Sequence, residues 1–175
     1  MTAWRGSLAN KDRALAHRLT GWRPPRWVRW WMLIASRGGD GYLWIAIAAA
    51  LACFGGPSRL LAIASAALAA CLGLVSFMVL KRLFRRPRPC AYWPHAWARV
   101  RAYDEFSFPS GHSETSFAIA TSLLLFYPDL RSLLIFCALS IALSRLLLGL
   151  HFLSDVLVGS VLGVLAGCLC FFLLR

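Results

Sequence analysis

Two histidines in the sequence stand beside groups suited to proton transfer or anion binding. His112 follows Ser110 and Gly111, and His151 lies four residues before Asp155. On a helix, this spacing places both side chains on one face, where the carboxylate can hold one imidazole nitrogen and leave the other basic. We therefore expect His151, oriented by Asp155, to act as a nucleophile and His112 to act as a general acid.

Three basic residues complete a set of groups suited to a phosphate. Lys81 and Arg88 stand in a basic run, residues 81–89, that follows an apolar segment, and Arg145 lies near the end of another apolar segment. An arginine binds phosphate oxygens through forked N–H donors, and the backbone amides around Ser110 and Gly111, at an expected helix start, add further donors. This inventory of side chains predicts phosphoryl transfer.

We expect no metal and no other cofactor at this site. The Asp, Glu, Cys and His residues do not cluster at the spacings of metal ligands, so side-chain cations would take the place of Mg²⁺ or Zn²⁺. Arg82, Arg85 and Arg86, in the same basic run, are interpreted as anchors for lipid headgroups at the end of a membrane span.

Long apolar segments must position these residues. The 175-residue chain is 59% hydrophobic with a mean hydropathy of +0.65, yet its formal net charge is +12. A soluble nucleic-acid-binding domain would need a polar surface to carry that charge, so we expect no nucleic-acid partner. The sequence predicts an all-α integral membrane bundle with five transmembrane helices. These are expected at residues 41–56, 60–80, 115–127, 132–150 and 156–174.

The first forty residues differ from the rest in composition. Arg and Trp are interleaved there, which predicts an interfacial segment over residues 1–40, with residues 25–36 as an alternative sixth span. Residues 41–175 are expected to form one transmembrane domain with a catalytic loop at 81–112. Within the last span, Gly159, Gly163 and Gly167 follow one another at four-residue spacing and predict a close helix-packing face.

The expected topology brings the three groups of polar residues to one face of the membrane. With five spans, the chain returns to the same side at Lys81, leaves it after His112 and returns again at His151. Burying ionisable residues at the edge of apolar spans is costly, and their default interpretation is functional. One anion-binding site explains all three groups together.

The combined pattern resembles that of a known family. It consists of Lys81 with six residues before Arg88-Pro89, then Pro109-Ser110-Gly111-His112, then Ser144-Arg145 with five residues before His151 and three more before Asp155. This pattern is similar to the three-part signature of the type 2 phosphatidic acid phosphatase superfamily. The resemblance implies a phosphohistidine on His151, a proton donor at His112 and no metal. Members often have six spans, which differs from the five expected here.

These observations predict an integral membrane phosphatase that removes the terminal phosphate of a phospholipid or a polyprenyl mono- or diphosphate. Transfer of the phosphoryl group to a lipid or sugar acceptor, or action on a soluble sugar phosphate, would use the same residues. A non-catalytic protein that binds anionic lipid is the alternative from another class. We expect a lipid phosphate substrate, contacts with membrane lipids and no obligatory protein partner, with residues 92–106 contributing to specificity.

The sequence leaves the orientation of the site open. The expected location is the bacterial inner membrane. With five spans, all basic residues except Arg59, Arg131 and Arg175 fall on the side of the site, which by the positive-inside rule favours the cytoplasm. The family resemblance instead favours the periplasmic side.

Overall fold

The computed structural model of the chain describes residues 2–93, 95, 97–98, 100 and 104–175. Of the segment 92–106, residues 94, 96, 99 and 101–103 therefore lie outside the described residues. The described part is helical and contains no strand apart from an isolated bridge between Pro87 and Phe106. Its elements are α1 (Thr2–Gly21), α2 (Arg26–Arg37), η1 (Gly38–Tyr42), α3 (Leu43–Phe54), α4 (Arg59–Phe84), η2 (Pro89–Ala91), α5 (Gly111–Phe126), η3 (Pro128–Leu130), α6 (Arg131–Leu147) and α7 (Leu153–Leu174).

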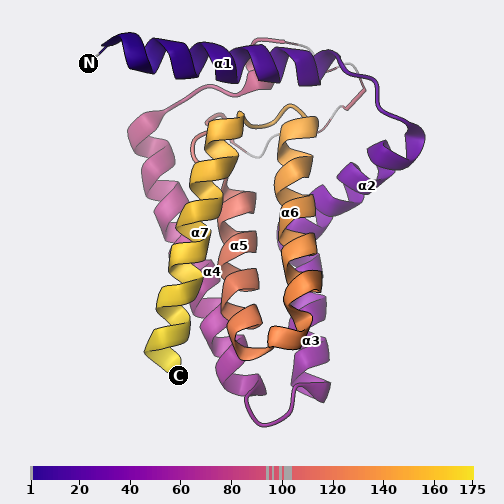
Figure 1. Cartoon of the computed structure of the whole chain (residues 1–175), viewed down its shortest axis with the longest axis vertical. Coiled ribbons are helices and arrows are strands. Elements are labelled where there is room, and N and C mark those ends of the chain that lie inside the picture. The colour runs from indigo at the N-terminus through magenta and orange to yellow at the C-terminus, as the bar shows by residue number, and fades with distance from the viewer. Residues whose placement is uncertain (1, 94, 96, 99, 101–103) are drawn as a thin grey trace.

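The bundle consists of helices α3 to α7, which run along the long axis of the molecule (Figure 1). Three helical stretches among the described residues are long and apolar enough to cross a membrane: Arg59–Phe84, Pro128–Leu147 and Leu153–Leu174. The expected span at 115–127 corresponds to α5, which has 16 residues, and the one at 41–56 corresponds to α3, which has 12. The all-α membrane bundle is thus confirmed.

The outer faces of α4, α6 and α7 carry exposed Leu, Val and Phe side chains, as expected of helices surrounded by lipid. Helix α5 is different, because many of its side chains are small and buried, among them Ser116, Ala118 and Ala120. It packs against α4, α6 and α7. The central position of α5 fixes where its first turn, which contains His112, lies relative to the other helices.

The glycines of α7 form the expected packing face, which is confirmed. A Cβ atom added at Gly159, Gly163 or Gly167 would lie 2.6 Å or less from the backbone oxygen of Ser110, Glu114 or Ala118. Helices α5 and α7 therefore approach each other backbone to backbone, a distance that a larger residue would prevent.

The N-terminal segment covers one end of the bundle. Helix α1 lies across that end rather than along the bundle axis, and α2 descends from it to α3 (Figure 1). Trp22, Trp27 and Trp30 are exposed in this region, as an interfacial position requires. Residues 26–36 belong to this descending helix, which meets α3 at a kink in η1, where Gly41 has a non-helical φ angle of 112°. Among the described residues, neither α2 nor α3 is one of the three stretches long and apolar enough to cross a membrane.

Candidate active site

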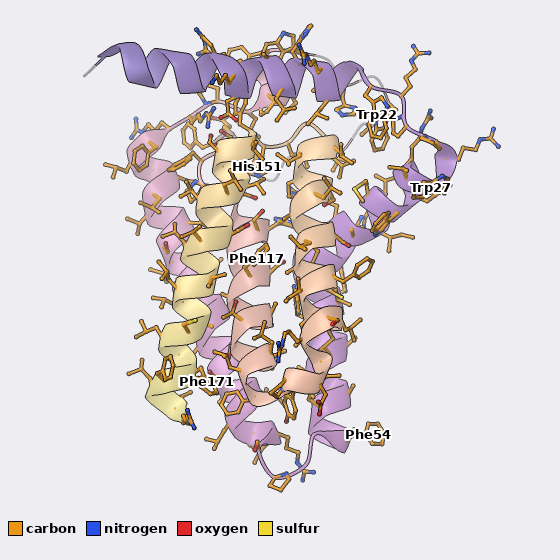
Figure 2. All side chains as sticks on the ribbon, in the orientation of Figure 1. Trp22, Trp27, Phe54, Phe117, His151 and Phe171 are labelled. Atoms are coloured by element: carbon orange, nitrogen blue, oxygen red, sulfur yellow. The ribbon has the colours of Figure 1, made fainter. Side chains whose placement is uncertain are left out.

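The polar residues singled out by the sequence lie at the end of the bundle that α1 covers. Figure 2 shows His151 there, below α1 and far from Phe54 at the opposite end. Lys81 comes from the last turn of α4, Arg145 from the last turn of α6 and His112 from the first turn of α5. The charges of Lys81 and Arg145 act on both histidines.

Two hydrogen-bond partners hold the imidazole of His151. Its Nδ1 lies 2.7 Å from the carbonyl oxygen of Ser107, and its Nε2 lies 2.9 Å from Nη1 of Arg88. A carbonyl only accepts and a guanidinium only donates, so Nδ1 carries the proton and Nε2 keeps its lone pair. Burial lowers the pKa of His151 well below its ordinary value, and the positive charges of Arg88 and Arg145 act in the same direction. The ring is therefore neutral, with the lone pair of Nε2 directed at Arg88.

His151 and Asp155 lie close together, but they do not share a helix, contrary to the expectation from their spacing. Helix α7 begins only at Leu153, so His151 lies outside it. Asp155 Oδ2 accepts a hydrogen bond from the amide of Phe152 at 2.8 Å and lies 3.7 Å from Nδ1 of His151. Asp155 thus caps α7, and the hydrogen bond that orients the ring comes from the carbonyl of Ser107.

Arg86 is not a headgroup anchor, contrary to the interpretation drawn from the sequence. Its Nη1 lies 2.7 Å from Oδ1 of Asp155, and its Nη2 lies 2.8 Å from Oδ2 of Asp12 in α1. Nη1 also donates to the hydroxyl of Ser154 at 2.6 Å, and the guanidinium stacks 4.0 Å from the ring centre of Phe152. Arg86 therefore connects α1 to the start of α7.

A carboxylate that the sequence did not indicate joins two of the expected phosphate-binding cations. Asp104 Oδ2 lies 2.6 Å from Nζ of Lys81, and its Oδ1 lies 2.8 Å from Nη2 of Arg88. Burial alone would raise the pKa of Asp104, but the hydrogen bonds from Lys81 and Arg88 outweigh it and leave the pKa below its ordinary value. Arg88 also donates to the carbonyls of Asp104 and Leu150, at 2.9 Å each. Both cations therefore face an anion in this conformation.

The start of α5 supplies only part of the expected backbone donors. The amide of Ser110 donates to the carbonyl of Asp155 at 3.1 Å, so this amide is not among the phosphate donors, contrary to expectation. Gly111 is the first residue of α5, where backbone amides have no partner within the helix. A Cβ atom at Gly111 would lie 3.0 Å from the ring of Phe77, so this position favours glycine.

The first forty residues contribute partners to the site. Arg145 Nη1 donates to the hydroxyl of Ser36 at 2.6 Å, and Nε2 of His112 lies 2.8 Å from Oδ1 of Asp40. The motif spacing in the sequence did not indicate Ser36, Asp40, Asp104, Ser107 or Asp12. One signal was available for the aspartates, because the chain has only 7 acidic residues against 19 Lys and Arg. An acidic residue in so basic a chain is a candidate partner for a functional cation or histidine.

The described residues include no group of three or more His, Cys, Asp or Glu that could hold a metal ion. The side chains that the site brings together are a neutral imidazole whose Nε2 lone pair faces Arg88, a second imidazole bound to a carboxylate, and a set of buried cations suited to an anion.

The fold and the site define a class of helical membrane protein with histidines and buried cations at one end of the bundle. The PAP2 superfamily model matches residues 60–175, and the chain belongs to this family. Two solved structures share the fold. A PAP2-type phosphatidylglycerolphosphate phosphatase from Bacillus subtilis is 24% identical with a TM-score of 0.72, and 95% of this chain and 86% of that one are covered. Aquifex aeolicus LpxE is 25% identical with a TM-score of 0.72, over 91% and 93% of the two chains.

Curated relatives match about half of the chain. A lipid A 1-phosphatase from Rhizobium johnstonii is 35% identical over 89 residues, which cover 49% of this chain and 36% of the relative. A decaprenylphosphoryl-5-phosphoribose phosphatase from Mycobacterium tuberculosis is 38% identical over 92 residues, which cover 53% and 50%. The matched region thus spans half or less of each relative's length.

Proposed function

We propose that this protein is an integral membrane phosphatase that hydrolyses the terminal phosphate of a lipid phosphate through a phosphohistidine on His151, without a metal. The observation that carries the proposal is the double hydrogen bond of the His151 ring. With the proton on Nδ1 held by Ser107, the lone pair of Nε2 faces the guanidinium of Arg88, the group expected to bind a phosphate oxygen.

The proposed reaction has two steps. In the first, Nε2 of His151 bonds to phosphorus while the bond from phosphorus to the lipid oxygen breaks, and His112 gives a proton to that oxygen. In the second, His112 takes a proton from water as the water oxygen bonds to phosphorus and the phosphorus–nitrogen bond breaks. Inorganic phosphate leaves, and both histidines return to their starting state. Lys81, Arg88 and Arg145 offset the charge on the phosphoryl oxygens.

A lipid substrate is supported by the position of the site and by the relatives. The site lies where apolar helices end, so a headgroup at the interface can reach it while hydrocarbon chains remain beside the helices. The curated relatives carry the names of phosphatases that act on lipid A and on a decaprenyl-linked phosphate. We place the protein in a bacterial inner membrane, with residues 41–175 as the catalytic domain and residues 1–40 as a cover that supports it.

The test is phosphate release by the purified protein in detergent. The panel contains phosphatidic acid, phosphatidylglycerophosphate, a polyprenyl phosphate and a polyprenyl diphosphate, each with and without EDTA. We expect release from at least one of them, unaffected by EDTA and lost in His151→Gln, while His17→Gln on exposed α1 retains it. Full turnover in His151→Gln would contradict the mechanism. Transfer of phosphate to an added lipid or sugar in place of release would contradict hydrolysis.

A further inference from the structure

Asp40 lies in a local break of the helix that joins α2 to α3. The π-helical turn η1 contains Gly38, Gly39, Asp40, Gly41 and Tyr42, and Gly41 has a φ angle of 112°. Residues with a side chain rarely adopt this angle, so glycine is required there. Gly41 therefore forms a kink between two helices, α2 and α3. The break brings Asp40 Oδ1 to 2.8 Å from Nε2 of His112.

The same break packs directly against the ring of His112. A Cβ atom added at Gly39 would lie 2.9 Å from Cδ2 of His112 and 2.7 Å from a methyl carbon of Ile141. The imidazole is therefore held by backbone contact at one edge and by the carboxylate of Asp40 at one nitrogen. Two independent features of this turn, the missing side chain at 39 and the acid at 40, fit the same ring.

A cavity of about 440 Å³ opens at this ring. Its lining includes Arg37, Asp40, Phe77, Gly111 and His112, so it lies between η1, α4 and the first turn of α5. It leaves space for a ligand beside His112.

The charges that surround His112 come from every side of this region. Asp40 faces the ring from η1, while Lys81 of α4 and Arg145 of α6 add positive charge, and Arg37 lines the same cavity. Burial and the neighbouring cations both disfavour a positively charged imidazole, and the adjacent carboxylate of Asp40 offsets part of that effect. Without the carboxylate, His112 would hold its proton less strongly.

We propose that Asp40 is a positioning residue for His112, accepting the N–H of Nε2 and presenting Nδ1–H to the oxygen of the leaving group. This inference rests on the proposed function, in which His112 protonates that oxygen. When the bond between phosphorus and the lipid oxygen breaks, the proton on Nδ1 moves to the oxygen, and the Nε2 proton remains on the ring, bound to Asp40. In the second step, water returns a proton to Nδ1.

The role predicts a dependence on the leaving group. An alkoxide from a lipid is strongly basic and needs a proton donor, whereas 4-nitrophenolate is weakly basic and leaves without one. We expect Asp40→Asn to lower kcat about 10-fold to 100-fold with phosphatidic acid and less than about 3-fold with 4-nitrophenyl phosphate. His112→Gln should show the same pattern more strongly. Asp129→Asn, at the opposite end of the bundle, is the matched control and should change neither rate.

The pH profile is the second measurement. Because Asp40 helps His112 keep its proton, the alkaline limb of kcat for phosphatidic acid should move to lower pH in Asp40→Asn and return toward its original position in Asp40→Glu. If Asp40→Asn does not fold, Gly39→Ala tests the same contact. The added methyl group displaces the ring of His112, while the carboxylate of Asp40 is retained. We again expect a lower kcat with phosphatidic acid and little change with 4-nitrophenyl phosphate.

The outcomes separate this inference from the proposed function. If Asp40→Asn lowers kcat equally with both substrates, or if the alkaline limb of its pH profile does not move, the role of Asp40 is overturned. If His151→Gln is inactive while Asp40→Asn behaves like Asp129→Asn, only that role is contradicted. Turnover that persists in His151→Gln would contradict the proposed function, whatever the result at Asp40.

Discussion

Nη1 of Arg88 lies 2.9 Å from Nε2 of His151, so the nitrogen proposed as nucleophile accepts a hydrogen bond from a group proposed to bind phosphate. The other ring nitrogen is bound to the carbonyl of Ser107. This arrangement is incompatible with a protonated imidazole, because Nε2 would then present a proton to a cation. The site therefore holds the imidazole of His151 in its neutral form.

The neutral state of His151 predicts how stability depends on pH. Its pKa is lowered in the folded protein, whereas the unfolded chain has the ordinary value of about 6.5. Below that pH the unfolded chain binds a proton that the folded protein does not, so the folded protein becomes less stable as the pH is lowered. The variant His151→Gln has no imidazole at this position and therefore lacks this pH dependence. We expect the melting temperature of the unchanged protein to fall by a few degrees relative to His151→Gln between pH 7.5 and pH 5. A difference that does not vary with pH would contradict this prediction.

Asp104 predicts the behaviour of anions that compete with substrate. Its carboxylate binds Lys81 and Arg88, the cations proposed to receive phosphate, and its lowered pKa keeps it charged near neutral pH. A phosphate must therefore displace it or bind against its repulsion. We expect Asp104→Asn to lower the inhibition constant of inorganic phosphate several-fold, with Glu105→Gln, next to it on the surface, as the control. A raised inhibition constant would show instead that Asp104 holds the cations in place for phosphate.

Arg86 predicts a large effect on stability. Replacing it by Gln leaves the fully buried carboxylate of Asp155 without its partner Arg86 and removes one link between α1 and α7, while the hydrogen bonds from Ser154 to Asp12 remain. Removing one member of a buried pair costs roughly 3 kcal/mol or more. Thermal unfolding in detergent measures the change, and Arg82→Gln, an exposed neighbour, should remain within about 0.5 kcal/mol of the unchanged protein. Equal melting temperatures for the two variants would contradict the role given to Arg86.

The contact between α5 and α7 predicts the effect of a single methyl group. A Cβ atom at Gly163 would overlap the backbone of Glu114, which cannot move aside without shifting α5. We expect Gly163→Ala to destabilise the bundle by about 1 to 3 kcal/mol. Gly21→Ala is the matched control, because an added Cβ there has no atom within 4 Å. Equal melting temperatures for Gly163→Ala and Gly21→Ala in thermal unfolding would contradict this prediction.

The parts of the fold that follow from local pattern were predictable. Apolar segments located the helices of the bundle, and the four-residue spacing of Gly159, Gly163 and Gly167 located the face that α5 contacts. The path of residues 25–36 was not predictable in the same way. This short Trp-rich stretch meets the next helix at a kink at Gly41, and the apolar pattern does not locate that kink.

The site was predictable as a set of residues but not as a set of contacts. Motif spacing identified Lys81, Arg88 and His151 because the side chains that do chemistry recur at fixed intervals. The partners of these residues come from distant or irregular segments. Spacing alone suggested that Asp155 would hold His151, yet the helix begins two residues after the histidine, so the ring turns to the carbonyl of Ser107.

Detection of the covalent intermediate tests the central claim most directly. The protein would be mixed for milliseconds with phosphatidic acid carrying a labelled phosphate, quenched in alkali, and digested to locate the label. We expect a phosphorylated peptide that contains His151, is stable in alkali and labile in acid, and is absent from His151→Gln. Phosphate release from the unchanged protein without such a peptide, or a label that persists in His151→Gln, would contradict it.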